Sequence, residues 1–423
     1  MKVKLAYGRN GLYVNLPDGV DVIRPRFVPG IKGEAGGIRD SLQNPIGTRP
    51  LSEQVNRGSR VVIVHTDITR ATPNDRILPV LIEELERCGV RRTDITLLNG
   101  LGTHRPQTEE ELRIMLGDFL VDNYRCLQHD PYDDANLVSL GPTRHGHPVR
   151  VNKIYLDSDF KILTGFIEPH FFAGFSGGPK AILPSLAGVE SVYSNHGREM
   201  IAHPNAAWGI TEGNPIWEEM REVALATEPD FLLNVTLNSN REITGIFAGD
   251  MLTAHARGAI FVKENAMVSV DGAYDIVITT NSGYPLDQNL YQSVKGMSAA
   301  SQIVRSGGAI IMAAACKDGL PDHGQYAQLL KDAGSPEAVL EMISDPGFSV
   351  QDQWQVQIQA QIQLHANVFV YSHHLSSEQI RDALFEPCDN IEDLAADLQS
   401  QYGPHARICA LPEGPQTIPY LSS

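Results

Sequence analysis

The stretch Arg60-Val-Val-Ile-Val-His65 opens the part of the chain that decides the fold. Its run of β-branched residues is typical of a strand that is buried on both faces. Apolar residues then recur at the spacing of one helical face, up to a stop at Gly89: Leu78, Leu81, Ile82 and Leu85. The next predicted strand is Asp94-Ile-Thr-Leu-Leu-Asn99. A strand, a helix and a second strand in this order indicate an α/β fold with a parallel sheet that helices cover on both faces.

The same rhythm continues to about residue 265 and restarts beyond it. In the first half, we expect a strand at 160–166, a hairpin at 231–248 and a helix at 252–265. In the second half, the pattern predicts strands at 274–279, 308–313 and 367–371 and helices at 288–306 and 336–344. We therefore expect two α/β domains with largely parallel sheets, an N-terminal domain of residues 1–265 and a C-terminal domain of residues 266–423. The active site is expected in the cleft between them.

Four other segments give local expectations. The first 20 residues alternate weakly between polar and apolar and break at glycines, which predicts a hairpin. Residues 30–60 are rich in Gly, Pro and Ser and are expected to form a loop-heavy connection. Thr108-Glu-Glu-Glu-Leu should open a helix with a capping box. The glutamine-rich run 351–363 is expected to be an exposed helix with an apolar stripe.

Composition excludes several classes of protein. The formal net charge of −17 argues against a nucleic-acid-binding surface, which needs a basic patch. We find no run of about 18 apolar residues, so no membrane span is expected. The N-terminus lacks the apolar region of a secretory signal. The five cysteines are scattered and form no Cys-x-x-Cys pair, which is typical of reduced thiols, so we expect a cytoplasmic protein.

Polar side chains follow four predicted strands, at the point where each strand ends. They are Thr66, Asp67, Thr69 and Arg70, then Gly102, Thr103 and His104, then Glu168 and His170, and finally Asn281, Gly283 and Tyr284. In open α/β sheets, ligands bind beyond the carboxyl ends of the strands. These side chains therefore predict a functional site. Among the 14 histidines, His104 and His170 become candidates because each follows a strand end. By contrast, His145 and His147 lie in a polar turn and are interpreted as solvated.

The segment from Gly165 to Lys180, followed by Asn195-His196, combines a glycine-rich loop with a lysine and two histidines. Glycines allow the backbone to approach an anion closely. The segment is not a P-loop, because Pro179 precedes the lysine and alanine follows it. The position of Lys180 after the glycines favours an anion-binding or covalent role. In the helix from 288, Tyr291, Gln292 and Lys295 share one face, which could point across a cleft.

Taken together, these motifs resemble those of the nickel-dependent lactate racemase family over most of the chain. The resemblance rests on Asp67-Ile-Thr-Arg70, Gly102-Thr-His104-Arg-Pro106, the block from Glu168 to Lys180, Asn195-His196 and Tyr291-Gln-Ser-Val-Lys295, with Gln353-Trp354-Gln355 as a weaker match. It implies a racemase or epimerase that inverts C2 of a 2-hydroxy acid, lactate or a related acid, by hydride transfer. The implied cofactor is a nickel-pincer nucleotide, pyridinium-3,5-bisthiocarboxylic acid mononucleotide with nickel, which separate biosynthetic enzymes supply.

The resemblance also implies a role for each matching residue. Lys180 would hold the cofactor covalently, His196 would bind nickel, and His104 and His170 would be the two acid/bases. The substrate would contact Arg70, Gln292, Lys295 and Trp354. The cofactor would be supported by Asp67 and Tyr291, with Gly177 and Gly178 as further candidates in its pocket. Hydride removal from C2 gives a planar 2-keto acid, so each face of the substrate needs its own acid/base.

Two other functions fit the same residues. The first is a zinc-dependent hydrolase that uses His104, His170 and His196 as metal ligands. The second is a non-catalytic protein that binds small acids in the cleft between two α/β domains. The identity of the bound metal and a covalent adduct on Lys180 would separate these alternatives from the racemase.

Overall fold

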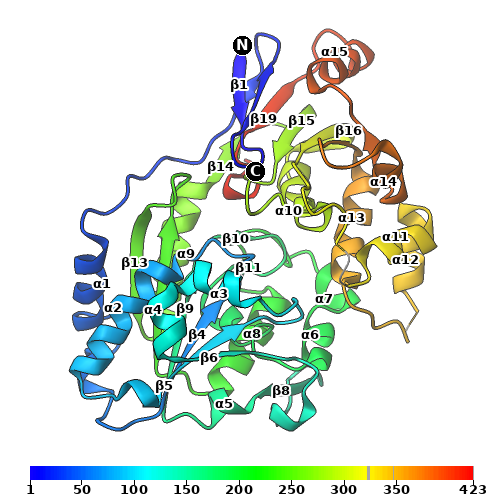
Figure 1. Cartoon of the computed structure of the whole chain (residues 1–423). Coiled ribbons are helices and arrows are strands. Elements are labelled where there is room, and N and C mark those ends of the chain that lie inside the picture. Colours follow the sequence, from blue (N-terminus) through cyan, green and yellow to red (C-terminus); the bar gives the residue numbers. More distant parts are fainter. Residues whose placement is uncertain (322–323, 346, 423) are drawn as a thin grey trace.

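Two six-stranded sheets organise the chain, as a computed structural model that describes residues 1–321, 324–345 and 347–422 shows (Figure 1). The first sheet has the order β13-β12-β9-β4-β5-β6. Its strands are β4 (Val61–Thr66), β5 (Ile95–Gly100), β6 (Arg125–Gln128), β9 (Phe160–Phe166), β12 (Phe231–Leu237) and β13 (Ile243–Gly249). All neighbouring pairs are parallel except β12 with β13, which form an antiparallel hairpin.

The alternation of side chains along β4 explains why helices cover both faces of this sheet. Val61 and Ile63 belong to one buried cluster, with side chains of α1 (Glu34–Gln43), α2 (Asn74–Arg87), α3 (Glu109–Leu116) and α4 (Asp118–Asn123). Val62 and Val64 belong to the other, which includes side chains of α8 (Pro215–Ala226) and α9 (Met251–Ala266). Because successive strand residues point to opposite faces, a wholly apolar strand requires a cover on each side.

The second sheet is parallel throughout and has the order β18-β17-β16-β15-β19-β3. Its strands are β3 (Asp21–Val22), β15 (Tyr274–Thr280), β16 (Val304–Ala313), β17 (Asn367–Tyr371), β18 (Glu386–Pro387) and β19 (Ile408–Leu411). One face packs with α10 (Leu290–Ser301), α11 (Tyr326–Ala333), α12 (Pro336–Ile343) and α13 (Gln353–His365). The other face packs with α15 (Ile391–Tyr402) and with the hairpin of β1 (Lys2–Leu5) and β2 (Leu12–Asn15).

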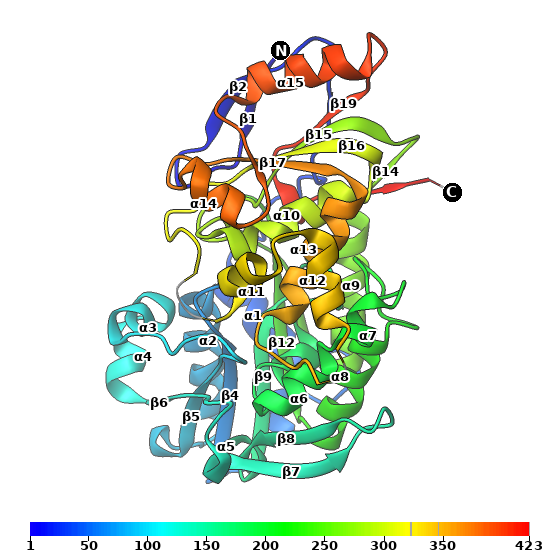
Figure 2. The ribbon, with the colours of Figure 1, turned by 90° about the vertical axis from the view of Figure 1, so that its right-hand side faces the viewer.

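The remaining elements are short. They are the hairpin of β7 (Leu137–Pro142) and β8 (Pro148–Asn152), α5 (Lys153–Leu156), β10 (Pro169–His170) with β11 (Gly174–Phe175), α6 (Val189–Asn195), α7 (Arg198–Ala202), α14 (Ser377–Asp382), and β14 (Met267–Val270) with β20 (Ile418–Leu421). Figure 2 shows α10 to α13 lying between the two sheets, with α6 and α7 next to them. None of the helices that the structure describes combines the length and apolar character that a membrane crossing requires.

Most expectations for the fold are confirmed. The chain has α/β architecture with largely parallel sheets, it begins with a hairpin, and Thr108 and Glu111 form the predicted capping box at the start of α3. The boundary between domains at residue 265 stays a prediction. The sequence did not indicate that strand β3 would join the second sheet, or that the hairpin β1–β2 would pack against the core of that sheet.

Two local expectations were wrong. Residues 30–60 contain the helix α1, because Ile38 and Leu42 bury one of its faces against α2 despite two internal glycines. The glutamine-rich run does form the helix α13, but most of that helix is buried rather than exposed. Its buried glutamines are tolerated because their amides donate to backbone carbonyls, as Gln359 does to Ala383 over 2.8 Å.

Candidate active site

A cavity of about 80 Å³ lies where the carboxyl ends of β4, β5 and β9 face α10 and α13. It is lined by nearly all the site residues predicted from sequence: Asp67, Arg70, His104, His170, Lys180, His196, Tyr291, Gln292, Lys295 and Trp354. We call each six-stranded sheet, together with the helices that pack on it, a layer. The first six residues come from the layer of the first sheet and the last four from the layer of the second sheet. The structure therefore brings residues from both halves of the chain into one small space.

The two predicted glycines lie outside the lining of this cavity. Gly178 donates its N–H to Asn234 Oδ1 over 2.9 Å, and a Cβ atom at this position would lie 2.6 Å from the ring of His255. At Gly177, whose φ is 75°, a Cβ atom would lie 2.5 Å from Asn234 Oδ1. Only glycine fits such close approaches. The loop is thus packed against α9 and β12 of the first sheet's layer, which fixes the 3-10 turn at 178–181 that carries Lys180.

The carboxylate of Asp67 orients His104. Its Oδ2 atom lies 2.6 Å from Nδ1 of His104, while Oδ1 accepts hydrogen bonds from the backbone and hydroxyl of Thr69. Burial alone would raise the pKa of Asp67, but the charge and hydrogen bond of His104 and the contacts with Thr69 hold this pKa well below its usual range. Because Nδ1 of His104 donates to a carboxylate, Nε2 is left with a lone pair and can accept a proton.

His170 has a different hydrogen-bond arrangement. The backbone N–H of Ala173 donates to its Nδ1 over 3.2 Å, so that this nitrogen is an acceptor and a neutral ring carries its proton on Nε2. Burial lowers the pKa of His170 well below its ordinary value, and the charges of Lys180 and Lys295 lower it further. The ring is neutral at rest and is held edge-on against Phe172, with ring centroids 4.5 Å apart. The two candidate acid/bases therefore present opposite hydrogen-bonding groups.

Two lysines share this cavity and are both destabilised as cations. Burial lowers the pKa of Lys180 well below its ordinary value, and the charges of Arg70 and Lys295 lower it further. Burial and the charge of Arg70 likewise lower the pKa of Lys295 to about 7. The charge of Glu168 opposes both shifts. A neutral, buried amine is a nucleophile, which is the property that a covalent role for Lys180 requires.

His196 caps the end of α6, with its ring between the two layers. The ring lies edge-on to Phe172 and to Trp354, at centroid distances of 4.9 and 5.3 Å. Its Nδ1 atom is buried and has no hydrogen-bond partner in the described part of the chain. Such an unpaired nitrogen costs free energy unless a ligand engages it. The same environment also includes Tyr291, whose hydroxyl accepts a hydrogen bond from Trp354 Nε1 over 3.1 Å.

A network that the sequence did not reveal supports the helix that ends at His196. Glu219, on α8, is fully buried and accepts hydrogen bonds from Thr143 Oγ1 over 2.6 Å and Asn195 Nδ2 over 2.8 Å. Nδ1 of His147 also lies 2.8 Å from this carboxylate. Because Asn195 directly precedes His196, the network ties this histidine to α8. Nothing in the sequence distinguished Glu219 from the surface carboxylates next to it.

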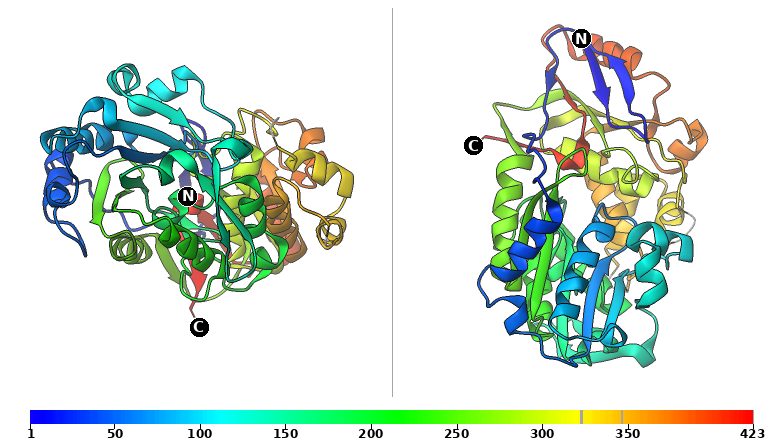
Figure 3. Two further views of the ribbon diagram at one scale, coloured as in Figure 1. Left: turned by 90° about the horizontal axis from the view of Figure 1, so that it is seen from below. Right: turned by 60° about the vertical axis from the view of Figure 1, so that its left-hand side comes forward.

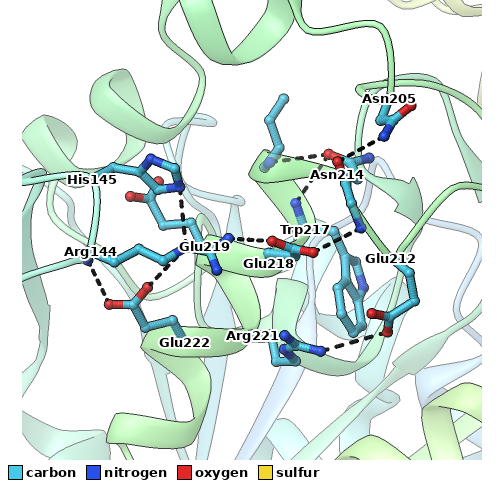
Figure 4. Close-up of polar contacts among 12 residues, drawn as sticks. Arg144, His145, Asn205, Glu212, Asn214, Trp217, Glu218, Glu219, Arg221 and Glu222 are labelled. Atoms are coloured by element: carbon cyan, nitrogen blue, oxygen red, sulfur yellow. Dashed lines mark hydrogen bonds and ion pairs between the residues drawn. The ribbon is translucent and has the colours of Figure 1, made fainter.

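Figure 4 shows how α8 presents its carboxylates to the turn after β7. Glu218 forms an ion pair with Arg144, and Glu222 accepts a hydrogen bond from the backbone of Arg144 over 2.8 Å. The interpretation of His145 and His147 as solvated residues therefore holds only for His145, which is exposed, whereas His147 is half-buried against Glu219.

The residues proposed for a zinc site do not form one. Within the described part of the chain, no group of three or more His, Cys, Asp or Glu side chains is arranged to hold a metal ion. His104 is engaged with Asp67, and His170 accepts a hydrogen bond from its own loop. The three histidines His104, His170 and His196 line the same cavity without forming a common ligand set.

Comparisons with known proteins give the family that the chain is similar to. Residues 7–209 match the lactate racemase N-terminal domain, and residues 270–418 match the lactate racemase C-terminal domain. The chain is 35% identical to a lactate racemase of Thermoanaerobacterium thermosaccharolyticum over 98% of both chains. It is 37% identical to a lactate racemase of Lactiplantibacillus plantarum over 89% of both chains.

Solved structures give the same result for the fold. The structure of the lactate racemase apoprotein from T. thermosaccharolyticum superposes with a TM-score of 0.92 and 33% identity, over 99% of this chain and 100% of that chain. A protein of Thermotoga maritima superposes with a TM-score of 0.72 over 94% of this chain and 100% of that chain. At 18% identity, this second likeness concerns the fold alone.

The first prediction concerns the lowered pKa of Lys180. Cyanate is a small reagent that modifies only unprotonated amines. Ordinary lysines, with a pKa of about 10.4, are protonated at pH 7. Cyanate should therefore carbamylate Lys180 of the apoprotein at this pH, because the pKa of Lys180 is lowered. Peptide mass mapping should show Lys180 among the first lysines modified at pH 7, ahead of the lysines on the surface of the protein. Modification of Lys180 no earlier than these surface lysines would show that its amine is not neutral.

The second prediction concerns Glu219. Replacement by leucine removes the acceptor of Thr143, His147 and Asn195, and breaking a buried charged network costs about 3–5 kcal/mol of unfolding free energy. The variant Glu219→Gln keeps part of the network and should lose less. On the same helix, Glu222→Gln is the matched control and should change the unfolding free energy by less than about 0.5 kcal/mol. Urea unfolding of the three variants measures this order, and a stable Glu219→Leu protein would contradict it.

Proposed function

The chain belongs to the lactate racemase family and is an isomerase, and from this membership we propose that it inverts C2 of lactate, or of a related 2-hydroxy acid, with a nickel-pincer nucleotide. One observation carries the proposal. Two histidines with opposite hydrogen-bonding arrangements, a lysine with a lowered pKa and further cationic groups line a single small cavity.

The cationic side chains would hold the substrate carboxylate. Arg70 presents a planar guanidinium, which can bind a carboxylate through two parallel hydrogen bonds. Lys295 faces it from α10, and binding of an anion between them would raise the pKa of Lys295 from about 7 and restore its charge. Gln292, on the same helix, offers an uncharged donor and acceptor. The substrate would thus be bound by side chains from both layers.

The residues present also fit the proposed cofactor. Lys180 offers a neutral amine, which could form a covalent bond to a carbonyl or thiocarbonyl carbon, and His196 offers a buried nitrogen that has no partner among the residues that the structure describes. Imidazole is a suitable ligand for nickel. When bound, the cofactor supplies an acceptor for the hydrogen at C2 of the substrate. Asp67 and Tyr291 would stabilise its surroundings through His104 and Trp354, with which they form hydrogen bonds.

The two histidines would move the hydroxyl proton. His104 has its Nδ1 proton fixed by Asp67, so its Nε2 can accept the proton from the hydroxyl of one enantiomer. The resulting imidazolium is stabilised by the buried carboxylate. His170 would serve the opposite face as a proton donor once it is protonated, because its resting neutral ring carries a proton on Nε2 and its Nδ1 accepts the N–H of Ala173. Its resting ring is neutral, and the negative charge of a bound substrate would offset the repulsion from Lys180 and Lys295 that keeps its pKa low.

The third prediction tests the cofactor. Protein produced without the enzymes of cofactor biosynthesis should be inactive, whereas co-expression with them should give a lactate racemase that carries nickel and a covalent adduct. Intact-mass spectrometry should show the adduct on the wild type and not on Lys180→Ala, and elemental analysis should show nickel lost from His196→Ala. Zinc in place of nickel would favour the hydrolase, and lactate binding without turnover by the loaded protein would favour a binding protein.

The fourth prediction separates the two histidines. Because each turnover uses both, His104→Ala and His170→Ala should each reduce racemisation in both directions by about 10²- to 10⁴-fold. Single-turnover formation of the 2-keto acid should still occur slowly in each variant from one enantiomer, and the preferred enantiomer should differ between the two. Racemisation near the wild-type rate in either variant would remove that histidine from the mechanism.

A further inference from the structure

A second and larger cleft, of about 620 Å³, adjoins the active-site cavity. Residues 166–169, at the end of β9 and the start of β10, line this cleft, and the next residue, His170, lines the active-site cavity. The two spaces therefore share one short segment of chain. Glu168 is the residue of that segment whose charge acts on Lys180 and Lys295.

The cleft lies where the chain crosses between the two layers. Residues 24–28 lead from β3 of the second sheet toward α1, and residues 261–266 end α9 before β14 begins. Both segments line the cleft. Figure 1 and the right-hand view of Figure 3 show the first crossing as the blue segment that descends from the N-terminal hairpin to α1. These crossings are where a change in the relative orientation of the layers must be accommodated.

The charge of this cleft is opposite to that of the whole chain. Its lining holds the cationic residues Lys4, Arg9, Arg24, Arg26 and Arg241. Against these it holds the carboxylates of Glu168 and Glu413. In a chain with a formal net charge of −17, such a local excess of cationic groups is a favourable environment for an anion.

Arg9 and Arg241 bring two of these charges together across the boundary between the layers. The guanidinium of Arg9, from the hairpin β1–β2, lies 3.7 Å from the ring centroid of Tyr284. Arg241, from the turn between β12 and β13, donates to the carbonyl of Tyr284 over 2.9 Å. Burial lowers the pKa of Arg241, and the charge of Arg9 lowers it further. Among the residues with described positions, no carboxylate forms an ion pair with either guanidinium.

We propose that this cleft binds a small multivalent oxyanion, either a di- or tricarboxylate or a phosphate monoester, between Arg9 and Arg241. Each guanidinium can donate two parallel hydrogen bonds to a carboxylate or phosphate, and a bound anion relieves their mutual repulsion. Because the two arginines belong to different layers, the anion joins these layers beside both chain crossings. The ligand thereby restrains the segment that precedes His170. This site is separate from the one that the proposed racemisation uses.

Isothermal titration calorimetry tests the binding at constant ionic strength, with citrate and ribose 5-phosphate as probes and acetate as the monovalent control. We expect at least one multivalent probe to bind saturably. Acetate should show no measurable binding at this site. The double variant Arg9→Gln/Arg241→Gln should weaken binding at least about tenfold, because it removes two charge-assisted contacts. As the matched control, Arg91→Gln removes a charge from an exposed arginine outside the cleft and should leave the affinity unchanged.

The active-site variant Arg70→Gln distinguishes the two cavities. The Arg70→Gln variant should bind the multivalent probe with the same affinity as the wild type. If the probe instead binds the double variant and fails to bind Arg70→Gln, the anion occupies the active-site cavity. Hydrogen exchange then tests the restraint: the probe should slow exchange in residues 24–28 and 261–266 of the wild type and leave the double variant unaffected. Absence of saturable binding in the wild type, or binding without this protection, overturns the proposal.

Discussion

The constraint on which the site depends is the mutual repulsion of Arg70, Lys180 and Lys295 in one desolvated cavity. Cationic groups that share a buried space cannot all remain protonated without compensation. A guanidinium keeps its proton in proteins, so the lysines are the groups that give theirs up. This explains why burial and Arg70 together lower the pKa of both lysines, that of Lys295 to about 7. The cavity consequently has affinity for an anion and also presents a neutral amine.

The fold holds these three mutually repelling cationic side chains close together. Arg70 follows β4, Lys180 stands on a turn packed against the core by Gly177 and Gly178, and Lys295 projects from α10 in the other layer. These elements are anchored by large apolar clusters, one of which spans both layers, and the clusters supply the free energy that offsets the repulsion. An active site with such charges therefore requires two well-packed layers rather than a single flexible loop.

Much of this arrangement could be predicted from the sequence, because it follows from patterns of a few residues. Runs such as 61–64 predicted the strands, and the rule that parallel strands end at one edge brought His104 and His170 together. The roles of Lys180 and His196 came from the family resemblance and not from periodicity. The placement of β3 and the first hairpin could not be predicted, since a two-residue strand carries no pattern that selects a sheet. Glu219 was missed because a glutamate beside other glutamates resembles a solvated helix face.

The position of His196 shows why the network of Glu219 and the placement of the second layer matter for the site. On one side, Asn195 is tied to Glu219 and to the carbonyl of Ile216, both within the first layer. On the other side, the ring contacts Trp354 of α13, and Gln357 of the same helix donates to the carbonyl of Arg198 over 3.0 Å. The backbone of this histidine is thus fixed by one layer, whereas its ring is enclosed by the other. A displacement of the second layer would change the surroundings of the ring while the Asn195 anchor stays in place, so the relative position of the two layers is part of the environment of the proposed metal ligand.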